Sequence, residues 1–172
     1  MLKLLLSLPI LRRLIPSVLK KLPHKEINYK YDNINFNLDL RYLVDRRFFL
    51  YGYDVKNIEI LNRHIQKYET GYFLDIGSCW GLYSIQIAKK NPEIKVLSFD
   101  VFEQNINRLK KMSLKNNVQN IETYNIAVGS EESEVEFSVD EEFSPNYSKD
   151  LNGKFKIKVK QKKIDTILVI RN

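Results

Sequence analysis

Residues 72–88 read YFLDIGSCWGLYSIQIA, and this stretch decides the fold. Its first five residues are mostly apolar and predict a short buried strand. Leu82, Ile85 and Ala88 recur at helical spacing, so a helix follows the strand. The turn between them, Gly77 to Gly81, lets a ligand approach the backbone closely because glycine has no Cβ. The start of the helix adds unpaired N–H groups, so the stretch predicts a ligand-binding loop.

The residues that follow extend this pattern into an α/β sheet. A second strand over 95–99 ends in Asp100, 19 residues after Gly81. A carboxylate at the carboxyl end of that strand can accept hydrogen bonds from both hydroxyls of a ribose. A helix over 102–116 and a third strand over 121–128 come next. Strands that alternate with helices of this length indicate a parallel sheet.

The spacing of the glycines differs from that of dinucleotide-binding folds. Dinucleotide-binding folds use Gly-x-Gly-x-x-Gly. Here the pattern is Asp-x-Gly-x-x-x-Gly, with Ser78 and Cys79 where a middle glycine would fall. No Gly-Lys-Ser/Thr follows, so the loop is not the P-loop of nucleoside triphosphatases.

Further elements are predicted on both sides of this unit. Alternating apolar residues over 27–40, with a turn at Asp32-Asn33, predict a β-hairpin, and residues 58–68 predict a helix that ends at Gly71. Alternation over 135–139 and 154–160 predicts an antiparallel pair, with a turn at Asn152-Gly153. Two interpretations of the lysines within 154–160 stay open. They form either a basic stripe that binds phosphate backbones, or the solvated face of a strand that protects a sheet edge from aggregation.

Composition places the chain among globular proteins. Hydrophobic residues make up 44% and charged residues 28% of its 172 positions, which argues against disorder, collagen or a coiled coil. A single cysteine, Cys79, excludes an intramolecular disulfide framework. No run reaches the roughly 18 apolar residues of a membrane span. The formal net charge of +7 identifies no partner by itself.

Residues 1–22 form a separate segment that mixes Leu and Ile with basic residues. A cleaved signal peptide is disfavoured because Arg12-Arg13 interrupts the apolar run and no clear cleavage site follows. Two interpretations stay open: a basic amphipathic helix on an anionic membrane face, or a helix that packs on the domain or frays. We expect Pro16 to kink or split any helix that runs through it.

Between about Leu43 and Leu168 the sequence resembles the FkbM-type methyltransferases, a branch of the class I S-adenosylmethionine-dependent enzymes. Residues 73–84 are similar to the first motif of that family. Residues 98–105 resemble its Phe-Glu-Pro-x-x-x-Asn segment, and residues 125–129 resemble its Asn-x-Ala-x-Gly segment. Residues 51–54 and 164–168 also resemble family stretches.

The resemblance implies a Rossmann-like parallel sheet with antiparallel hairpin additions, and S-adenosylmethionine as the cofactor. The methionine end would lie against the glycine loop, the ribose on the acid after the second strand, and the adenine near the end of the third strand. Asp75 would orient the loop or the methionine ammonium. The implied cofactor-binding residues are Asp75, Gly77, Ser78, Gly81, Asp100, Asn125 and Ala127.

The resemblance also implies the reaction and the setting. The family transfers methyl groups, typically to hydroxyl oxygens of sugars, glycans or small metabolites, so the expected partner is such an acceptor and not a nucleic acid. The expected location is the cytoplasm, and the membrane interpretation of residues 1–22 would add peripheral contact at the inner membrane face. Residues 23–172 are then a partial methyltransferase domain. No catalytic base is identified.

The sequence departs from the family pattern in two ways. Cys79-Trp80, Asp100 and Val101 replace residues that are usual in its motifs. The fourth strand with its Lys-x-Asp-x-Glu-Gly segment is also missing, so we expect a domain truncated at the C-terminus, in which the first strand has an unpaired edge. Residues 167–170 are a weak candidate for a substitute strand. The alternative function is a non-enzymatic remnant that binds the cofactor weakly or not at all.

Three further side chains are of types that can serve as catalytic or metal-binding groups. Cys79 has no histidine near it in sequence and is expected to be a small loop residue, not a nucleophile. His24 and His64 have no suitably spaced metal-binding companion, so no metal site is expected.

Overall fold

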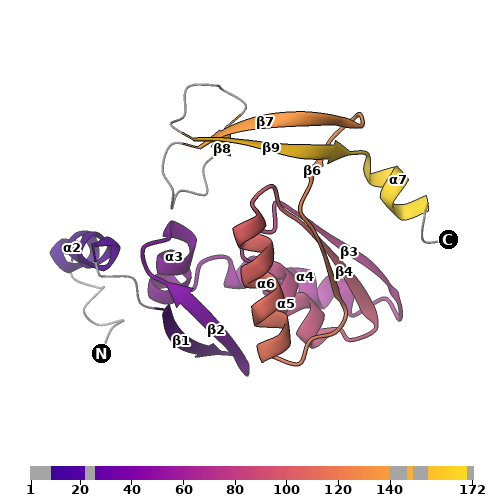
Figure 1. Cartoon of the computed structure of the whole chain (residues 1–172). Coiled ribbons are helices and arrows are strands. Elements are labelled where there is room, and N and C mark those ends of the chain that lie inside the picture. The colour runs from indigo at the N-terminus through magenta and orange to yellow at the C-terminus, as the bar shows by residue number, and fades with distance from the viewer. Residues whose placement is uncertain (1–8, 22–25, 140–146, 149–154, 170–172) are drawn as a thin grey trace.

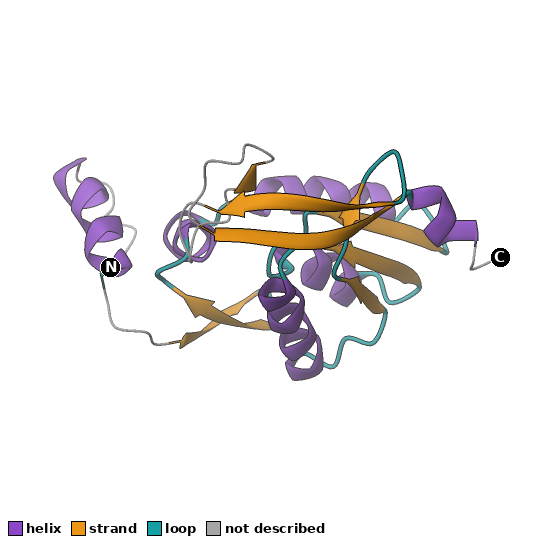
Figure 2. Cartoon of the chain, turned by 45° about the horizontal axis from the view of Figure 1, so that its top comes forward, coloured by secondary structure: helices purple, strands orange, loops and turns teal. Residues whose placement is uncertain are grey.

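The computed structural model of the chain describes residues 9–21, 26–139, 147–148 and 155–169. Its centre is a parallel sheet with helices packed against it, and a second sheet crosses above that core (Figure 1). Helix α2 (Pro9–Lys20) and helix α7 (Ile164–Val169) lie at opposite ends of the molecule in both views (Figures 1 and 2).

The central sheet has the strand order β3-β4-β5, with all pairs parallel. Its strands are β3 (Gly71–Ile76), β4 (Ile94–Phe99) and β5 (Ile121–Tyr124). Helix α5 (Leu82–Lys90) connects the first pair and α6 (Glu103–Lys115) connects the second. The predicted strand, loop, helix and strand are therefore confirmed, but the predicted burial of the first strand is wrong. No residue of β3 is buried and Ile76 is 58% exposed, because β3 has a hydrogen-bonded neighbour on one side only in the described residues.

The N-terminal hairpin is also confirmed. It consists of β1 (Glu26–Tyr31) and β2 (Ile34–Asp39), joined by Asp32 and Asn33, which both have positive φ as a two-residue hairpin turn requires. The inward side chains of β2 are fully buried. Helix α4 (Val55–Ile65) corresponds to the predicted helix, but the predicted end at Gly71 is wrong. The helix ends at Ile65 with Gln66 as its C-cap, and Gly71 is the first residue of β3. Helix α3 (Leu43–Tyr51) was not predicted.

One large hydrophobic cluster joins the hairpin, the helices and one face of the central sheet. Aromatic edge-to-face contacts form its middle, with Phe36 packed on both Phe48 and Trp80 at centroid distances of 5.0 and 5.9 Å. Trp80 belongs to the glycine loop, so the loop is anchored in this core. The cluster contains buried side chains of β2, α3, α4, α5, β4 and α6.

The third strand was predicted over 121–128, and this length is wrong, because β5 ends at Tyr124. The chain leaves the central sheet after Tyr124, and residues 127–128 form β6 (Ala127–Val128) in a second sheet of order β6-β9-β7-β8. The strand breaks because β6 pairs in parallel with β9 (Phe155–Lys162), which lies far along the sequence.

The predicted antiparallel pair is confirmed within this second sheet. Strand β7 (Ser133–Val139) pairs with β9 from Ser133 opposite Gln161 to Val139 opposite Phe155, and β8 (Tyr147–Ser148) pairs with β7. The lysines at 156, 158 and 160 are exposed, and Lys156 forms a salt bridge of 3.0 Å with Glu136. The predicted turn at Asn152-Gly153 lies outside the described residues.

The last described element is a helix, so the alternative of a substitute strand over 167–170 is wrong as far as Val169. Helix α7 packs on the other face of the central sheet. There Ile167 forms a small buried cluster with Leu97 and Phe99 of β4. Strand β4 is therefore covered on both faces.

Helix α2 is a single helix, and Pro16 lies inside it without splitting it. Pro9 begins this helix, at a position where the missing N–H costs nothing. None of the helices in the described ranges is both long and apolar enough to cross a bilayer.

Candidate functional site

The glycine loop and the carboxyl end of β4 meet through Asp100. Its Oδ2 accepts a hydrogen bond of 2.8 Å from the Cys79 N–H in the loop. Its Oδ1 accepts from the Phe102 N–H at 2.8 Å and from Asn105 Nδ2 at 3.1 Å. Asp100 is 2% exposed. The carboxylate therefore joins the loop to the start of α6, and it already accepts three hydrogen bonds from the protein.

The loop follows β3 in a tight turn. The N–H groups of Gly77 and Ser78 both donate to the Phe99 carbonyl at 2.9 Å, and the Gly81 N–H donates to the Ser78 carbonyl at 2.8 Å. The Ser78 hydroxyl is buried and has no hydrogen-bond partner in the described part of the chain. A buried polar atom without a partner is costly, so this hydroxyl is a candidate contact for a ligand group.

Two glycines of the loop have positive φ, but their surroundings differ. Gly77 has φ +78°, and a Cβ there would have open space around it. Gly81 has φ +91°, and a Cβ there would lie 2.3 Å from Leu109 Cδ1. Gly77 therefore leaves room beside the loop backbone, whereas Gly81 permits close packing of the loop on α6.

Asp75 holds the start of α5. Its Oδ2 accepts hydrogen bonds from the Ser84 N–H at 3.1 Å and from the Ser84 hydroxyl, which also contacts the Ser98 hydroxyl at 2.7 Å. Burial raises the pKa of Asp75, the Ser84 bonds oppose this shift, and nearby Asp100 adds to it. The sequence predicted that Asp75 orients the loop, but it did not indicate Ser84 as its partner, because this pairing depends on how α5 packs on the sheet.

Of the two residues predicted near the end of the third strand, Asn125 lies at the site and Ala127 does not. Asn125 Nδ2 donates to the Asp100 carbonyl at 3.0 Å, so Asn125 lies beside the carboxyl end of β4. Ala127 is buried in β6 and pairs with Gln161 in the second sheet. Asp75, Gly77, Ser78, Asp100 and Asn125 thus lie at the same sheet edge, while Gly81 packs on α6 and Ala127 belongs to the other sheet.

An ion pair outside the predicted set, between a buried carboxylate and a partly exposed guanidinium, supports the loop. Asp45 of α3 and Arg108 of α6 form an ion pair of 2.6 Å, and the Arg108 guanidinium lies 5.5 Å from the Trp80 ring centroid. The Trp80 side chain is thereby enclosed between α3 and α6. Sequence analysis missed this pair because its members are 63 residues apart.

Cys79 is not an activated nucleophile. Burial, with a smaller effect from Asp100, raises the pKa of its thiol to about 12, so the thiol is neutral near pH 7. His64 packs beside Tyr68, at a ring-centroid distance of 5.7 Å. His24 lies outside the described residues. Within the described ranges no group of three or more His, Cys, Asp or Glu residues could hold a metal ion.

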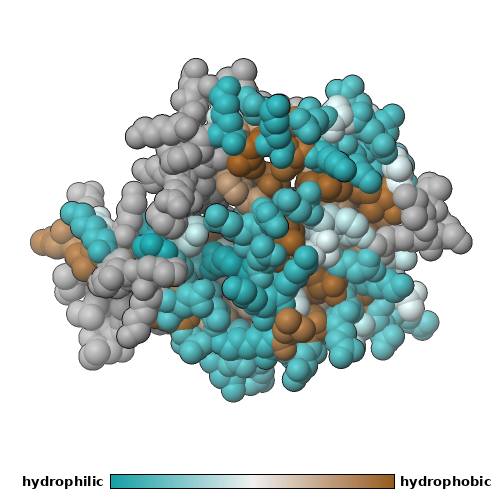
Figure 3. Space-filling model, in the orientation of Figure 1, coloured by the Kyte–Doolittle hydropathy of each residue, from teal (hydrophilic) through white to brown (hydrophobic). Residues whose placement is uncertain are grey.

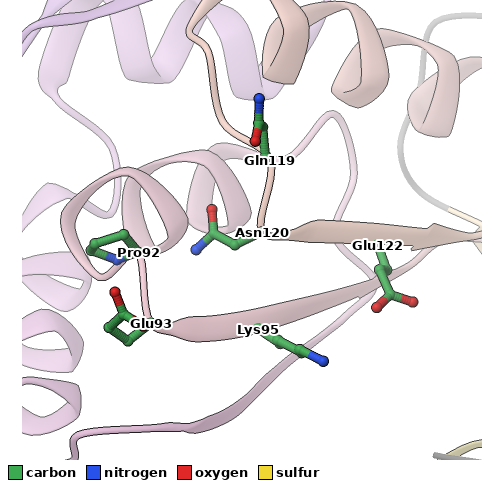
Figure 4. Close-up of a pocket in the computed structure, with 6 residues that line it drawn as sticks. All are labelled: Pro92, Glu93, Lys95, Gln119, Asn120 and Glu122. Atoms are coloured by element: carbon green, nitrogen blue, oxygen red, sulfur yellow. The ribbon is translucent and has the colours of Figure 1, made fainter.

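A pocket of about 350 Å³ lies at the opposite edge of the sheet (Figure 4). It is lined by Pro92, Glu93, Lys95, Gln119, Asn120 and Glu122. These residues surround the amino ends of β4 and β5, whereas Asp100 follows the last residue of β4. None of the predicted cofactor-binding residues lines this pocket.

Comparisons with known proteins find similarity to methyltransferases. Residues 69–130 match a family model described as a putative methyltransferase. No curated protein matches the chain. Among solved structures, an S-adenosylmethionine-dependent methyltransferase from Agrobacterium tumefaciens is similar with a TM-score of 0.50 and 13% identity, over 62% of this chain and 34% of that one. A tRNA (uracil-54, C5)-methyltransferase from Pyrococcus abyssi gives a TM-score of 0.41 and 21% identity, over 60% and 24%.

These matches concern methyltransferases in general and do not identify the FkbM-type branch. The chain spans about a third of the length of the Agrobacterium enzyme. With the β3-β4-β5 order, the helical crossovers and the loop between β3 and α5, the central sheet and its helices have the fold of the class I S-adenosylmethionine-dependent methyltransferases.

Proposed function

We propose that the chain binds S-adenosylmethionine at the carboxyl edge of the central sheet and belongs to a methyltransferase of the FkbM-like kind. The observation that carries this proposal is the 2.8 Å hydrogen bond between the Cys79 N–H and Asp100. It keeps the turn proposed for the methionine end beside the strand end proposed for the ribose. The class I fold and the family match over 69–130 support the same cofactor.

The local chemistry fits this group in two respects. Gly77 leaves open space at the backbone, and the buried Ser78 hydroxyl has no partner in the described residues. In our proposal these two residues take the methionine portion, Asp75 and Gly81 fix the loop, and Asn125 borders the adenine. Asp100 already accepts three of the roughly four hydrogen bonds that a carboxylate can accept, so binding both ribose hydroxyls there requires the exchange of one of them.

The proposed reaction is methyl transfer to a hydroxyl oxygen of a sugar, glycan or small metabolite. The bound cofactor supplies a sulfonium methyl group, which is already activated for in-line displacement. The task of the protein is then mainly to position the acceptor. We assign no residue as catalytic base.

One observation favours a second candidate, a non-enzymatic protein that binds the cofactor weakly or not at all. The Asp100 carboxylate is almost completely buried and serves to hold the loop and α6. A carboxylate engaged in this way stabilises the fold whether or not a ribose is present.

Isothermal titration with S-adenosylmethionine and S-adenosylhomocysteine tests the proposal. We expect a roughly micromolar dissociation constant for the unaltered chain. Gly77→Ala should weaken binding roughly tenfold or more, because its methyl group occupies the open space at the loop and its φ of +78° disfavours a side chain.

Asn117→Ala is the matched control. Asn117 is exposed, has φ +51° and lies between α6 and β5 at the other edge of the sheet. The substitution carries a similar backbone cost and should leave the affinity unchanged. Absence of heat with the unaltered chain at high concentration would support the second candidate. Equal weakening by both substitutions would remove the loop from the proposal.

A further inference from the structure

Helix α2 presents three apolar side chains to solvent along one face. Ile10, Leu14 and Val18 are 72%, 54% and 59% exposed, and each is four residues from the next. Residues at this spacing lie one above another on a helix. We call these three residues the α2 stripe. Hydrophobic atoms are visible at this end of the molecule in the space-filling view (Figure 3).

The helix is connected to the domain on another side. Leu19, which is half-buried, packs against the main hydrophobic cluster. Because Leu19 contacts the core, the exposure of the α2 stripe does not arise from a helix that makes no contact with the rest of the chain. The stripe is an apolar surface without a partner in the described residues.

The net charge of the protein is concentrated around this helix. Residues 1–25 contain six basic residues and no acidic one: Lys3, Arg12, Arg13, Lys20, Lys21 and Lys25. The other 147 residues carry 22 basic and 21 acidic residues, so they are nearly neutral. An apolar stripe within a uniformly basic segment is complementary to a surface that is apolar inside and anionic outside.

We propose that α2 lies along the surface of a bilayer that contains anionic lipids. The stripe enters the boundary of the acyl chains, and the net positive charge of residues 1–25 favours anionic headgroups. The helix has 12 residues and is therefore about 18 Å long, too short for a hydrocarbon core of about 30 Å, so it lies in the plane of the interface.

Two other partners explain less of what is observed. A nucleic acid would neutralise the basic residues, but its phosphate backbone offers no apolar surface to the stripe. A second copy of the chain could cover the stripe, but it would bring two uniformly basic segments together. An anionic bilayer matches both properties at once.

Co-sedimentation with vesicles tests the apolar part of the proposal. We expect the full chain to pellet with phosphatidylcholine vesicles that contain phosphatidylglycerol, and much less with phosphatidylcholine alone. The triple variant Ile10→Ser, Leu14→Ser, Val18→Ser should reduce the partition coefficient roughly tenfold or more, because buried methylene groups drive interfacial binding.

The matched control replaces exposed apolar residues elsewhere. Ile60 of α4 is 55% exposed and Leu114 of α6 is 78% exposed. The double variant Ile60→Ser, Leu114→Ser should pellet like the unaltered chain. All five side chains are exposed, so the thermal unfolding midpoints should agree. If the triple variant unfolds earlier, Leu14→Ser alone gives the same comparison.

A second series tests the charge. Arg12→Gln, Arg13→Gln and Lys20→Gln should each weaken binding to anionic vesicles about fivefold at low salt, the equivalent of about 1 kcal/mol per basic residue at such a surface. The control, Lys110→Gln with Lys111→Gln on the exposed side of α6, should have no effect. Binding should also weaken as salt rises above about 0.1 M.

Three results would overturn the proposal. The first is equal pelleting of the triple variant and its control. The second is retention on RNA that depends on the basic residues, without any vesicle binding. The third is a concentration-dependent dimer that the stripe substitutions dissociate, which would assign the stripe to a second copy.

Discussion

At the scale of single residues, the two loop glycines make opposite demands on their surroundings. A methyl group at Gly81 would lie 2.3 Å from Leu109, which is itself fully buried, and the φ of +91° adds backbone strain. We predict that Gly81→Ala lowers the free energy of unfolding by about 2–4 kcal/mol. Urea unfolding followed by circular dichroism measures this change.

Gly77→Ala is the comparison at the same scale. It has a similar φ but no neighbour within reach of the new methyl group. We therefore expect it to lower the free energy of unfolding by only about 1 kcal/mol. The prediction fails if the two substitutions destabilise the protein equally. In that case the close packing of Gly81 on α6 would contribute nothing to stability.

For single residues of the site, the sequence predicted a contact between the loop and Asp100 but not the burial of this carboxylate. The glycines and the acid at the end of β4 predicted that loop and Asp100 would meet, and the 2.8 Å bond confirms that they do. The near-complete burial of Asp100 was not predictable. It depends on the amide of Phe102 and the side chain of Asn105, whose positions are set by how α6 begins.

At the scale of helices and strands, periodicity predicted the elements whose buried faces are apolar. It missed α3 because the buried face of this helix includes Asp45 and Arg46, which do not read as core residues. The break between β5 and β6 depends on pairing with β9, and a local pattern contains no information on so distant a partner. The helical state of α7 follows from packing on β4, against the strand preference of its branched residues.

The contact between α3 and α6 yields a prediction at this scale. Arg108→Met would leave Asp45 buried without its ion-pair partner, so we expect a loss of about 3–5 kcal/mol near pH 7. The double variant Asp45→Asn, Arg108→Met should recover much of this loss. Arg63→Met, on the exposed side of α4, is the control and should change little.

The Asp45–Arg108 ion pair also predicts how the destabilisation by Arg108→Met changes with pH. Burial raises the pKa of Asp45 above its usual 3.8, and Arg108 lowers it in opposition. Without Arg108 the pKa rises further, and a carboxyl with a raised pKa favours the folded state most at acidic pH and loses that contribution as pH rises. The destabilisation by Arg108→Met should therefore be smaller near pH 4 than near pH 7, and a larger loss at pH 4 would contradict it.

At the scale of the whole molecule, the two faces of the central sheet are covered unequally. In the described residues the main cluster contains 17 buried side chains, whereas the cluster on the other face contains Leu97, Phe99 and Ile167. The second sheet and α7 therefore depend on a small apolar contact. Regions with few buried apolar contacts open at lower free energy than the rest of a domain.

This asymmetry predicts how the molecule opens. Ile167→Ala should speed amide hydrogen exchange in β7, β9 and α7, since it removes most of the buried side chain that α7 contributes, and leave β1–β2 and β3–β4 almost unchanged. Ile85→Ala, in the main cluster, is the comparison and should reduce protection throughout the chain. Exchange measured by mass spectrometry resolves the two patterns. If Ile167→Ala instead weakened all elements alike, the second sheet would unfold together with the core, and the small cluster would be as strongly coupled to stability as the large one.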